Sequence, residues 1–379
     1  MLTVLVLREI APGETRVALV PETVARVRKA GARVVVERGA GDLAGFPDAA
    51  YLDAGAEVED GRAALLASAD VLLCVREPAG SDVAQLPAGA IVLGFLRPAR
   101  NEALFAALGA RGAGAFALER LPRTSRAQKM DALSSMATVA GYRAVLIAAA
   151  RLPRFFPLLM TAAGTIPPAH AFVLGAGVAG LTAIATARRL GAVVEAFDVR
   201  PAVREEVESL GATFVQAPPH APAPNPVDEE LGGGSGAYAK ELSAAEEASE
   251  RALLAKHVAQ SDVVITTANV PDRKAPVLVT AEMVAAMRPG SVIVDLAAES
   301  GGNCALTRAG EDVLAHGVHV LGPVNLPAGL PGHASQMLSR NLSALLLHLV
   351  KDGALNLDWS DDITAGACVV RPRPQGAPA

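Results

Sequence analysis

Three glycines and one acidic residue near the middle of the chain are spaced in a way that suits a phosphate-bearing ligand. Gly175, Gly177 and Gly180 follow an apolar run and open a helical pattern, and a second apolar run ends at Asp198. In a strand–turn–helix unit the first glycine allows a tight turn, the second lets a pyrophosphate approach the backbone, and the third lets the helix pack closely on its strand. Free N–H groups and the positive end of the helix dipole then face the phosphates.

The acidic residue and the arginines after it bear on which dinucleotide would bind. Asp198 lies 23 residues after Gly175, where a carboxylate hydrogen-bonds a ribose 2′-hydroxyl and repels a 2′-phosphate, so the pattern favours NAD over NADP. Arg200 and Arg204 follow directly and could instead attract a 2′-phosphate. Because glycine-rich turns also occur with no ligand at all, that plainer interpretation stays open at this point.

A second group of polar residues precedes a long helical pattern. The sequence RTSRAQKMDALSS begins at Arg123, and its candidate site residues are Arg123, Gln128, Asp131 and Ser134. An arginine, an amide and a carboxylate together can hold a carboxamide and a ribose in place without acting as acid or base. The alternative is a polar loop that caps a helix, with Asp131 as the N-cap or as a first-turn charge.

The histidines and cysteines suggest little chemistry by their spacing. The seven histidines do not cluster, and each is more easily explained as structural or solvated than as catalytic; His333, in a glycine-rich turn, is the one to check. The three cysteines are Cys74, Cys304 and Cys368, odd in number and in no metal-binding spacing. We therefore expect reduced thiols in a cytosolic protein, and no metal site.

The composition is typical of a globular protein. Hydrophobic residues make up 51% and charged residues 19% of the 379 residues, enough core for two or three domains. A net charge of −5, 3% aromatic residues and no basic run argue against nucleic acid as a partner. The N-terminal apolar run is too short for a signal peptide. Arginines and prolines interrupt the most apolar region, residues 139–178, so we expect no window of about 20 residues to span a bilayer.

Short apolar runs alternate with helical patterns along most of the chain. This rhythm predicts an α/β fold of two Rossmann-like, doubly wound parallel-sheet domains joined by long helices, with ligands at the carboxyl ends of the strands. In the first domain we expect a helix over residues 21–30 and strands at 3–7, 33–37, 71–75, 91–95 and 114–118. In the second we expect six strands, at residues 171–174, 193–197, 213–215, 263–267, 291–296 and 318–321.

Two long helical patterns set the expected domain organisation. One runs over residues 130–152 and connects the two domains, and the other, residues 337–350, can return the chain to the first domain. We therefore expect a discontinuous first domain and a continuous second one, with the bounds 1–130 plus 330–379 and 131–329.

A long insert separates the third and fourth strands expected in the second domain. Residues 216–240 are rich in proline and then in glycine, and they include Tyr238. Loops of this length are usually functional or disordered. We expect either a lid over a bound cofactor or a tolerated linker.

Several of these segments together resemble one family. The NAD(H)-binding domain of proton-translocating nicotinamide nucleotide transhydrogenase is similar to RAQKMDALSSMATVAGYRAV, GETRVALVPETV, VLGAGVAGLTAIATARRLGAVVEAFDVR, GGSGAYAKELS and DLAAESGGNCALT, and the likeness covers nearly the whole chain. The resemblance implies that NAD(H) binds here and exchanges a hydride directly with NADP(H) bound by a partner. It also implies membrane-embedded partner subunits, including an NADP(H)-binding domain, which couple the transfer to proton translocation.

The same resemblance implies roles for individual residues. Gln128 and Ser134 would contact the nicotinamide ribose or carboxamide, Asp131 would bond the ribose, and Arg123 would hold the carboxamide. These four are the expected catalytic residues. The expected cofactor-binding residues are Gly175, Gly177, Val178, Ala179, Gly180, Asp198, Val199, Arg200, Tyr238, Thr266, Ala268 and Glu299, with Tyr238 on the family's mobile lid. The chain would be cytoplasmic, associated peripherally with the inner membrane through its partner subunits, and we expect a homodimer.

Two alternatives remain beside this function. Alanine dehydrogenase is kin to the family, and its N-terminal arginine is matched by Arg16, so a soluble NAD-dependent alanine dehydrogenase-like enzyme is the first. That enzyme uses a lysine and a histidine where this chain has Arg76 and Arg97, and Glu299 stands where it has an aspartate. An arginine is always charged and cannot shuttle a proton. The second alternative is an NAD-binding module without turnover.

Overall fold

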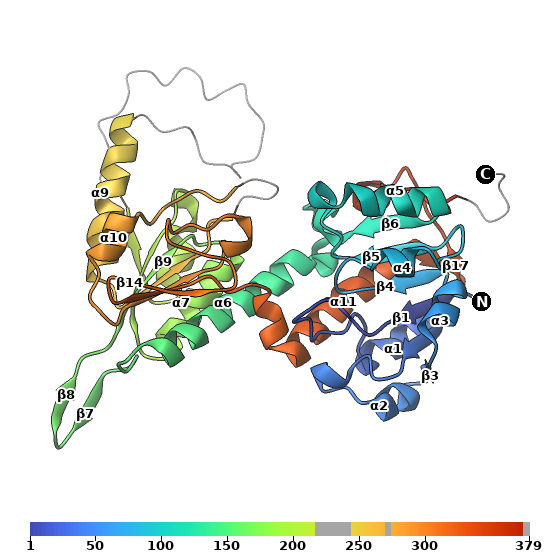
Figure 1. Ribbon diagram of the computed structural model, residues 1–379, viewed down its shortest axis with the longest axis horizontal. Helices are drawn as coiled ribbons and strands as arrows, with labels where there is room; N and C mark the ends of the chain where they lie inside the picture. The colour runs from blue at the N-terminus through green and yellow to red at the C-terminus, as the bar shows by residue number, and fades with distance from the viewer. Residues whose placement is uncertain (217–243, 270–273, 374–379) are drawn as a thin grey trace. The chain divides into compact units, whose positions relative to one another are not determined.

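The structure, a computed structural model, describes residues 1–216, 244–269 and 274–373, with side chains left undescribed at 244–247. Tyr238 lies outside these residues. The chain divides into two compact units: unit 1 comprises residues 1–139 and 327–379, and unit 2 comprises residues 140–326. Each unit is built on its own seven-stranded sheet with helices packed against it (Figure 1). The predicted α/β class with two parallel-sheet domains is confirmed.

The sheet of unit 1 has the strand order β18-β6-β5-β4-β1-β2-β3. Its six leading strands are parallel, and only β18 at one edge runs antiparallel. The strands are β1 (Thr3–Val6), β2 (Arg33–Glu37), β3 (Glu57–Glu59), β4 (Val71–Leu73), β5 (Ile91–Gly94), β6 (Gly114–Ala117) and β18 (Cys368–Val370). The α-helices are α1 (Pro21–Lys29), α2 (Asp48–Asp53), α3 (Arg62–Ala67), α4 (Gly80–Val83), α5 (Glu102–Arg111), α11 (Pro331–Leu349) and α12 (Asp362–Ala367).

The sheet of unit 2 repeats this arrangement, in the order β11-β10-β9-β12-β13-β15-β14. Only the edge strand β14 is antiparallel. The strands are β9 (His170–Leu174), β10 (Val193–Phe197), β11 (Thr213–Val215), β12 (Val263–Thr266), β13 (Val292–Asp295), β14 (Asp312–Ala315) and β15 (Val318–Leu321). The helices are α7 (Val178–Arg189), α8 (Arg204–Ser209), α9 (Ala244–Gln260) and α10 (Ala281–Ala285).

Smaller elements complete both units. Two short hairpins are β7 (Leu159–Thr161) with β8 (Gly164–Ile166) and β16 (Val350–Lys351) with β17 (Ala354–Leu355). Short 3₁₀ helices lie at η1 (Asp42–Ala44), η2 (Pro98–Arg100), η3 (Leu118–Arg120), η4 (Gln128–Met130), η5 (Pro201–Val203), η6 (Ala298–Ser300) and η7 (Leu326–Gly329).

Apolar strand residues pack on both faces of each sheet. In β1, Val4 and Val6 belong to one core cluster of unit 1 and Leu5 to another, because successive strand residues point to opposite faces. In β9, Val173 and Phe172 divide in the same way between the two clusters of unit 2. Strands buried on both faces read as continuous apolar runs, which is why the sequence located them.

The sequence did not predict the edge strands or the β7–β8 hairpin. β3 reads Glu-Val-Glu and is largely exposed, and β14 is also partly exposed. Edge strands of this kind lack the apolar run that identifies a central strand. β18 pairs with β6 from near the end of the chain, a pairing that no local pattern announces.

The expectation that no window of about 20 residues could span a bilayer is wrong for α6 (Ala132–Arg151). Within the described residues, α6 is the one helix long and apolar enough to do so by length and composition. Core helices of soluble proteins pass the same test. α6 contributes Met136 and Val139 to the core of unit 1, and Val145 and Ala148 to that of unit 2.

α11 is the long helix that anchors several loops of unit 1. It begins at Pro331, earlier than the expected start at Met337, because a proline is favoured in the first turn of a helix. Its Ser335 and Ser339 side chains are fully buried and accept hydrogen bonds from the backbone N–H groups of Val17 and Val20, each at 3.0 Å. Small polar residues of α11 thus bind backbone segments that have no strand or helix partner.

Candidate functional site

The turn after β9 has the geometry that a dinucleotide phosphate requires. Gly175 has a φ of +101°, which side chains rarely adopt, and Gly177 is the N-cap of α7. A Cβ added to Gly180 would collide with the carbonyl oxygen of Gly175, so only glycine lets α7 approach β9 this closely. A Cβ on Gly177 would meet no atom within 4 Å. The space in front of this helix N-terminus is therefore open, as a pyrophosphate would need.

The first turn of α7 presents its backbone to this open space. Val178, a predicted cofactor contact, is 42% exposed, and Ala179 beside it is half-buried. An exposed valine at the start of a helix leaves neighbouring N–H groups accessible. The expected phosphate site is thus accessible in the described structure.

Asp198 lies beside the glycine turn, at the carboxyl end of the neighbouring strand β10. Its Oδ2 accepts a hydrogen bond from the Ala176 N–H at 2.7 Å, which ties the acid to the turn. Arg200 donates to the same carboxylate through its backbone N–H, Nε and Nη2, each at 2.9 Å. Burial on its own would raise the pKa of Asp198, but these hydrogen bonds outweigh it and hold the pKa below its usual value. Val199, between them, is 47% exposed.

The strands β12 and β13 deliver further residues to the same edge of the sheet. Thr267 donates its hydroxyl to the Gly175 carbonyl at 3.1 Å, so the segment after β12 is tied to the glycine turn. Ala268, a predicted contact, follows directly, and Asn303 holds it through both its N–H, at 3.0 Å, and its carbonyl, at 2.8 Å. Thr266 is fully buried and donates to Asp295, so its side chain supports this edge from within.

Asp295 organises the loop after β13 and was not singled out in the sequence. This fully buried carboxylate accepts hydrogen bonds from Thr266, Ala297, Asn303, Cys304 and Thr307. The signal that could have found it is an acid that ends an apolar strand, as Asp198 does.

Glu299 is an exposed residue of η6 at the same carboxyl edge. Its Oε1 accepts a hydrogen bond from the backbone N–H of Asn325 at 2.7 Å. Asn325 has a φ of +48°, a left-handed conformation that asparagine tolerates better than most residues. The predicted Glu299 therefore joins the loops after β13 and β15.

The predicted residues Arg123 to Ser134 lie in unit 1, in the loop between β6 and α6. Asp131 caps α6: its Oδ1 accepts from the Ser134 N–H at 2.9 Å, and its Oδ2 accepts from the Ser134 hydroxyl at 2.5 Å. The capping interpretation is therefore correct for Asp131. Both side chains remain partly exposed, and Arg123 and Gln128 are exposed. A carboxylate fixed by its own helix and flanked by an exposed amide and guanidinium is suited to orienting a polar ligand.

The arginines that correspond to the dehydrogenase site are engaged with carboxylates. Arg16 is buried and paired with Glu14 through Nε at 2.7 Å and Nη2 at 2.6 Å. Arg97 is paired with Glu77, and Arg76 lies within 3.9 Å of the same carboxylate. These guanidinium groups neutralise carboxylates of the chain itself and are not preorganised for a keto acid.

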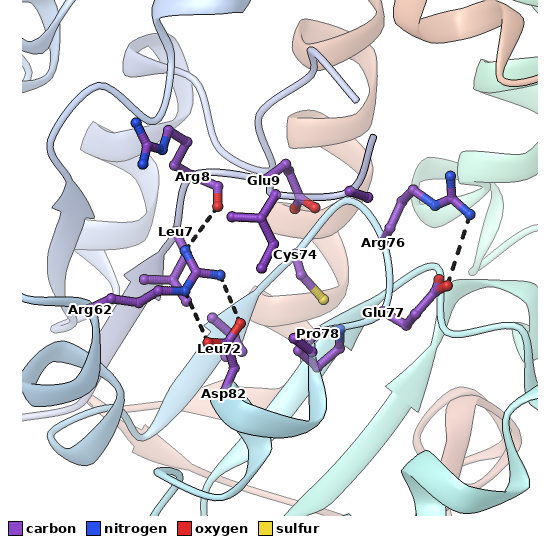
Figure 2. Close-up of a pocket in the computed structure, with 13 residues that line it drawn as sticks. Leu7, Arg8, Glu9, Arg62, Leu72, Cys74, Arg76, Glu77, Pro78 and Asp82 are labelled. Carbon is purple, nitrogen blue, oxygen red and sulfur yellow. Dashed lines mark hydrogen bonds and ion pairs between the residues drawn. The ribbon is translucent and has the colours of Figure 1, made fainter. Parts of the chain in front are cut away.

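A cavity of about 220 Å³ lies at the carboxyl ends of β1 and β4, where the strand order of unit 1 reverses (Figure 2). Arg62 forms part of its wall and pairs with Asp82 in bidentate fashion, at 2.9 and 2.7 Å. Burial raises the pKa of Glu9 to about 7, although a hydrogen bond from the Val75 N–H opposes the shift. Burial also raises the pKa of the Cys74 thiol, which makes it a poor nucleophile.

Comparison with known proteins follows the same division of the chain. Residues 5–140 match the alanine dehydrogenase/PNT N-terminal domain, and residues 144–373 match the alanine dehydrogenase/PNT C-terminal domain. This chain belongs to the alanine dehydrogenase/PNT family. Its family membership agrees with the resemblance found in the sequence.

Named relatives fall in both branches of the alanine dehydrogenase/PNT family. The chain is 44% identical to the NAD(P) transhydrogenase subunit alpha of Haemophilus influenzae, covering 98% of this chain and 71% of that one. It is also 44% identical to the first of the separate chains that make up the NAD(P) transhydrogenase subunit alpha of Rhodospirillum rubrum, covering 96% and 95%. The crystal structure of transhydrogenase from Sinorhizobium meliloti matches with a TM-score of 0.87 and 42% identity over 98% and 99% of the two chains. An L-alanine dehydrogenase matches with a TM-score of 0.80 and 26% identity, over 98% and 96%.

Metal binding has no visible basis in residues 1–216, 244–269 and 274–373. No group of three or more His, Cys, Asp or Glu side chains in these ranges is placed to hold a metal ion. Cys74, Cys304 and Cys368 are free thiols in the structure. The site chemistry must therefore be argued from the turn after β9 and the loop before α6.

Proposed function

We propose that this chain is the NAD(H)-binding component of a proton-translocating NAD(P) transhydrogenase. The observation that carries the proposal is the open N-terminus of α7 at Gly177, with Asp198 bonded to the turn beside it. The high identity to transhydrogenase alpha subunits supports it, because the likeness extends over nearly the whole chain.

Residues of the two units would hold different parts of the dinucleotide. The backbone of Gly175 to Gly180 would bind the pyrophosphate, and Asp198 the adenosine ribose. Arg123, Gln128, Asp131 and Ser134 would orient the nicotinamide ribose and carboxamide. The nicotinamide supplies the hydride chemistry when bound, and the residues of this chain supply orientation and exclusion of water.

The second candidate, an alanine dehydrogenase-like enzyme, is supported by the fold match but not by the arginines. Arg16 is held by Glu14, and Arg97 by Glu77, in the places where a keto acid and its proton donor would be needed. A guanidinium keeps its proton at any working pH. We therefore favour transfer between two nucleotides, which requires no proton donor from this chain.

Hydride exchange between nucleotides tests the proposed function directly. The purified chain is mixed with a purified NADP(H)-binding domain of a transhydrogenase, NADPH and an NAD analogue with a distinct absorbance. We expect exchange well above that of either protein by itself. The absence of exchange, with NADH still bound, would leave only an NAD-binding module. NADH oxidation by pyruvate and ammonia, without a partner, would support the dehydrogenase instead.

The partners follow from the same proposal. NADP(H) would be bound by a partner domain, and membrane-embedded subunits would couple the transfer to proton movement. The chain would then be a cytoplasmic component attached peripherally to the inner membrane. Co-purification with those membrane subunits checks this placement.

A homodimer is proposed on the β7–β8 hairpin, which projects from the body of unit 2 (Figure 1). Residues 155–168 contain no charged side chain, and Met160 and Leu158 are 75% and 53% exposed. A two-stranded hairpin is marginally stable by itself in water, and exposed apolar side chains add to this cost. We propose that a second copy of the chain covers the hairpin.

A further inference from the structure

The turn that carries Gln128 is held by a residue more than 200 positions away in the sequence. Asn341, on α11, donates its side-chain N–H to the backbone carbonyl of Lys129 at 2.9 Å. Lys129 is the middle residue of η4, between two of the predicted nicotinamide contacts, Gln128 and Asp131. Asn341 is only 7% exposed, so this hydrogen bond is sheltered from water.

Asn341 is an unusual choice for a buried helix position. Its Oδ1 is buried and has no hydrogen-bond partner in the described structure. An unpaired buried acceptor costs about 1–3 kcal/mol, so an apolar residue of the same size would suit the fold of α11 better. Sites that sacrifice stability in this way are commonly functional. The useful half of the Asn341 amide is the half that binds the turn.

A second contact holds the same loop near the protein surface. Arg126 donates through Nη1 to Asp362 at 2.9 Å and through Nη2 to Asp361. Asp361 is itself fixed, because it caps α12 and accepts a hydrogen bond from His348 at 2.9 Å. Chiefly through the hydrogen bond from Arg126, the pKa of Asp361 lies well below its usual value, so the pair stays charged.

We infer that Asn341 and Arg126 are positioning residues that set the orientation of Gln128 and Asp131 toward a bound nicotinamide. The inference rests on the proposed function, since it assigns the loop a ligand. Asn341 fixes the backbone from the buried side, and Arg126 fixes it at the surface. Neither residue touches the ligand, and both act through the loop.

The expected effect is on rate more than on binding. Hydride transfer needs the reacting atoms in close alignment, and a displacement of about 1 Å can reduce the rate by about a hundredfold. The phosphates and the adenosine would still be held by unit 2. A looser loop should therefore lower the turnover rate and leave the affinity for NADH nearly unchanged.

The first test compares Asn341→Leu with Ser339→Ala. Ser339 is a matched control, because it lies on the same helix and makes an equally buried hydrogen bond, but to the segment before α1. For Asn341→Leu we expect hydride exchange at least tenfold slower, an NADH dissociation constant within threefold of wild type, and thermal stability no lower than wild type. For Ser339→Ala we expect a small loss of stability and a wild-type rate.

The second test keeps the inference open to refutation if Asn341→Leu does not fold. Arg126→Gln removes an exposed ion pair, and Arg340→Gln, which breaks the exposed pair with Glu22, is its control. We expect slower exchange, by about threefold or more, only for Arg126→Gln. Equal rates in each variant and its control would overturn the inference. No exchange by the wild-type chain would instead overturn the proposed function, so the two failures are distinguishable.

Discussion

Arg200 fills the acceptor capacity of Asp198. The carboxylate receives four hydrogen bonds, one from Ala176 and three from Arg200, and a carboxylate accepts about four in all. A ribose 2′-hydroxyl could bind Asp198 only by displacing part of Arg200. The guanidinium also cancels the negative charge that would otherwise repel a 2′-phosphate.

Removal of this guanidinium should sharpen the choice between nucleotides. In Arg200→Ala the carboxylate regains free lone pairs and an uncompensated charge. We expect the ratio of NADH to NADPH affinity to rise by about tenfold, equivalent to roughly 1.4 kcal/mol, measured by fluorescence titration. Arg204→Ala is the control, because Arg204 contacts Phe214 and Gln216 instead of the acid. An unchanged or smaller ratio in Arg200→Ala would show that Arg200 does not offset Asp198.

Two glycines of the turn should respond to alanine in opposite ways. Gly177→Ala meets no atom of the protein, so the chain should fold with wild-type stability but bind NADH at least tenfold more weakly, since the methyl group occupies the pyrophosphate space. Gly180→Ala collides with the Gly175 carbonyl and should lower the free energy of unfolding by about 2 kcal/mol or more. Calorimetry and NADH titration on both variants check the pair. Wild-type affinity in Gly177→Ala would exclude the turn as the phosphate site.

The loop before α6 should affect rate without affecting the fold. Gln128 is exposed, so Gln128→Ala should leave stability unchanged, and Asp131→Asn keeps an oxygen that can cap α6. We expect both to slow hydride exchange by about tenfold or more while weakening NADH binding less. Lys129→Ala, an exposed neighbour, is the control. A wild-type rate in both variants would remove these residues from the site.

Glu9 should make stability depend on pH. Its folded pKa of about 7 lies above the ordinary 4.5, so between these values the folded chain holds a proton that the unfolded chain has lost. The free energy of unfolding should therefore fall as pH rises from 4.5 to 7, by about 1–3 kcal/mol. Glu9→Gln keeps an acceptor for Val75 and should remove this fall. Denaturation of both proteins at pH 5, 6, 7 and 8 measures it, and parallel curves would contradict the shift.

The β7–β8 hairpin should control the oligomeric state. Met160→Asp places a charge on the most exposed apolar side chain of the hairpin, where it would be desolvated against a second copy. We expect the variant to be monomeric by light scattering at a concentration where the wild type is dimeric. Leu314→Asp, on the exposed edge strand β14, is the control and should stay dimeric. A wild-type monomer, or a dimer in both variants, would reject the hairpin as the interface.

Local sequence patterns account for the two parallel sheets and for the glycine turn. Central strands are buried on both faces, so their apolar runs appear in the sequence without reference to any partner. The turn at Gly175, Gly177 and Gly180 is equally local, because its conformation depends on neighbouring residues. The exposed edge strands β3 and β14 leave no such signature.

The partners of each polar side chain were decided by the tertiary structure. The residues after Asp198 are plain in the sequence, yet only the folded turn shows that Arg200 occupies the acid. Asp295, Asn303 and Asn341 act on backbone groups far away in the chain, and such contacts leave no periodicity to read. Sequence by itself determined which segments form strands, helices and the phosphate turn, because those depend on short-range sterics and apolar spacing. Tertiary structure decided which side chains are free to meet a ligand, because hydrogen bonding between distant segments consumes or releases their capacity.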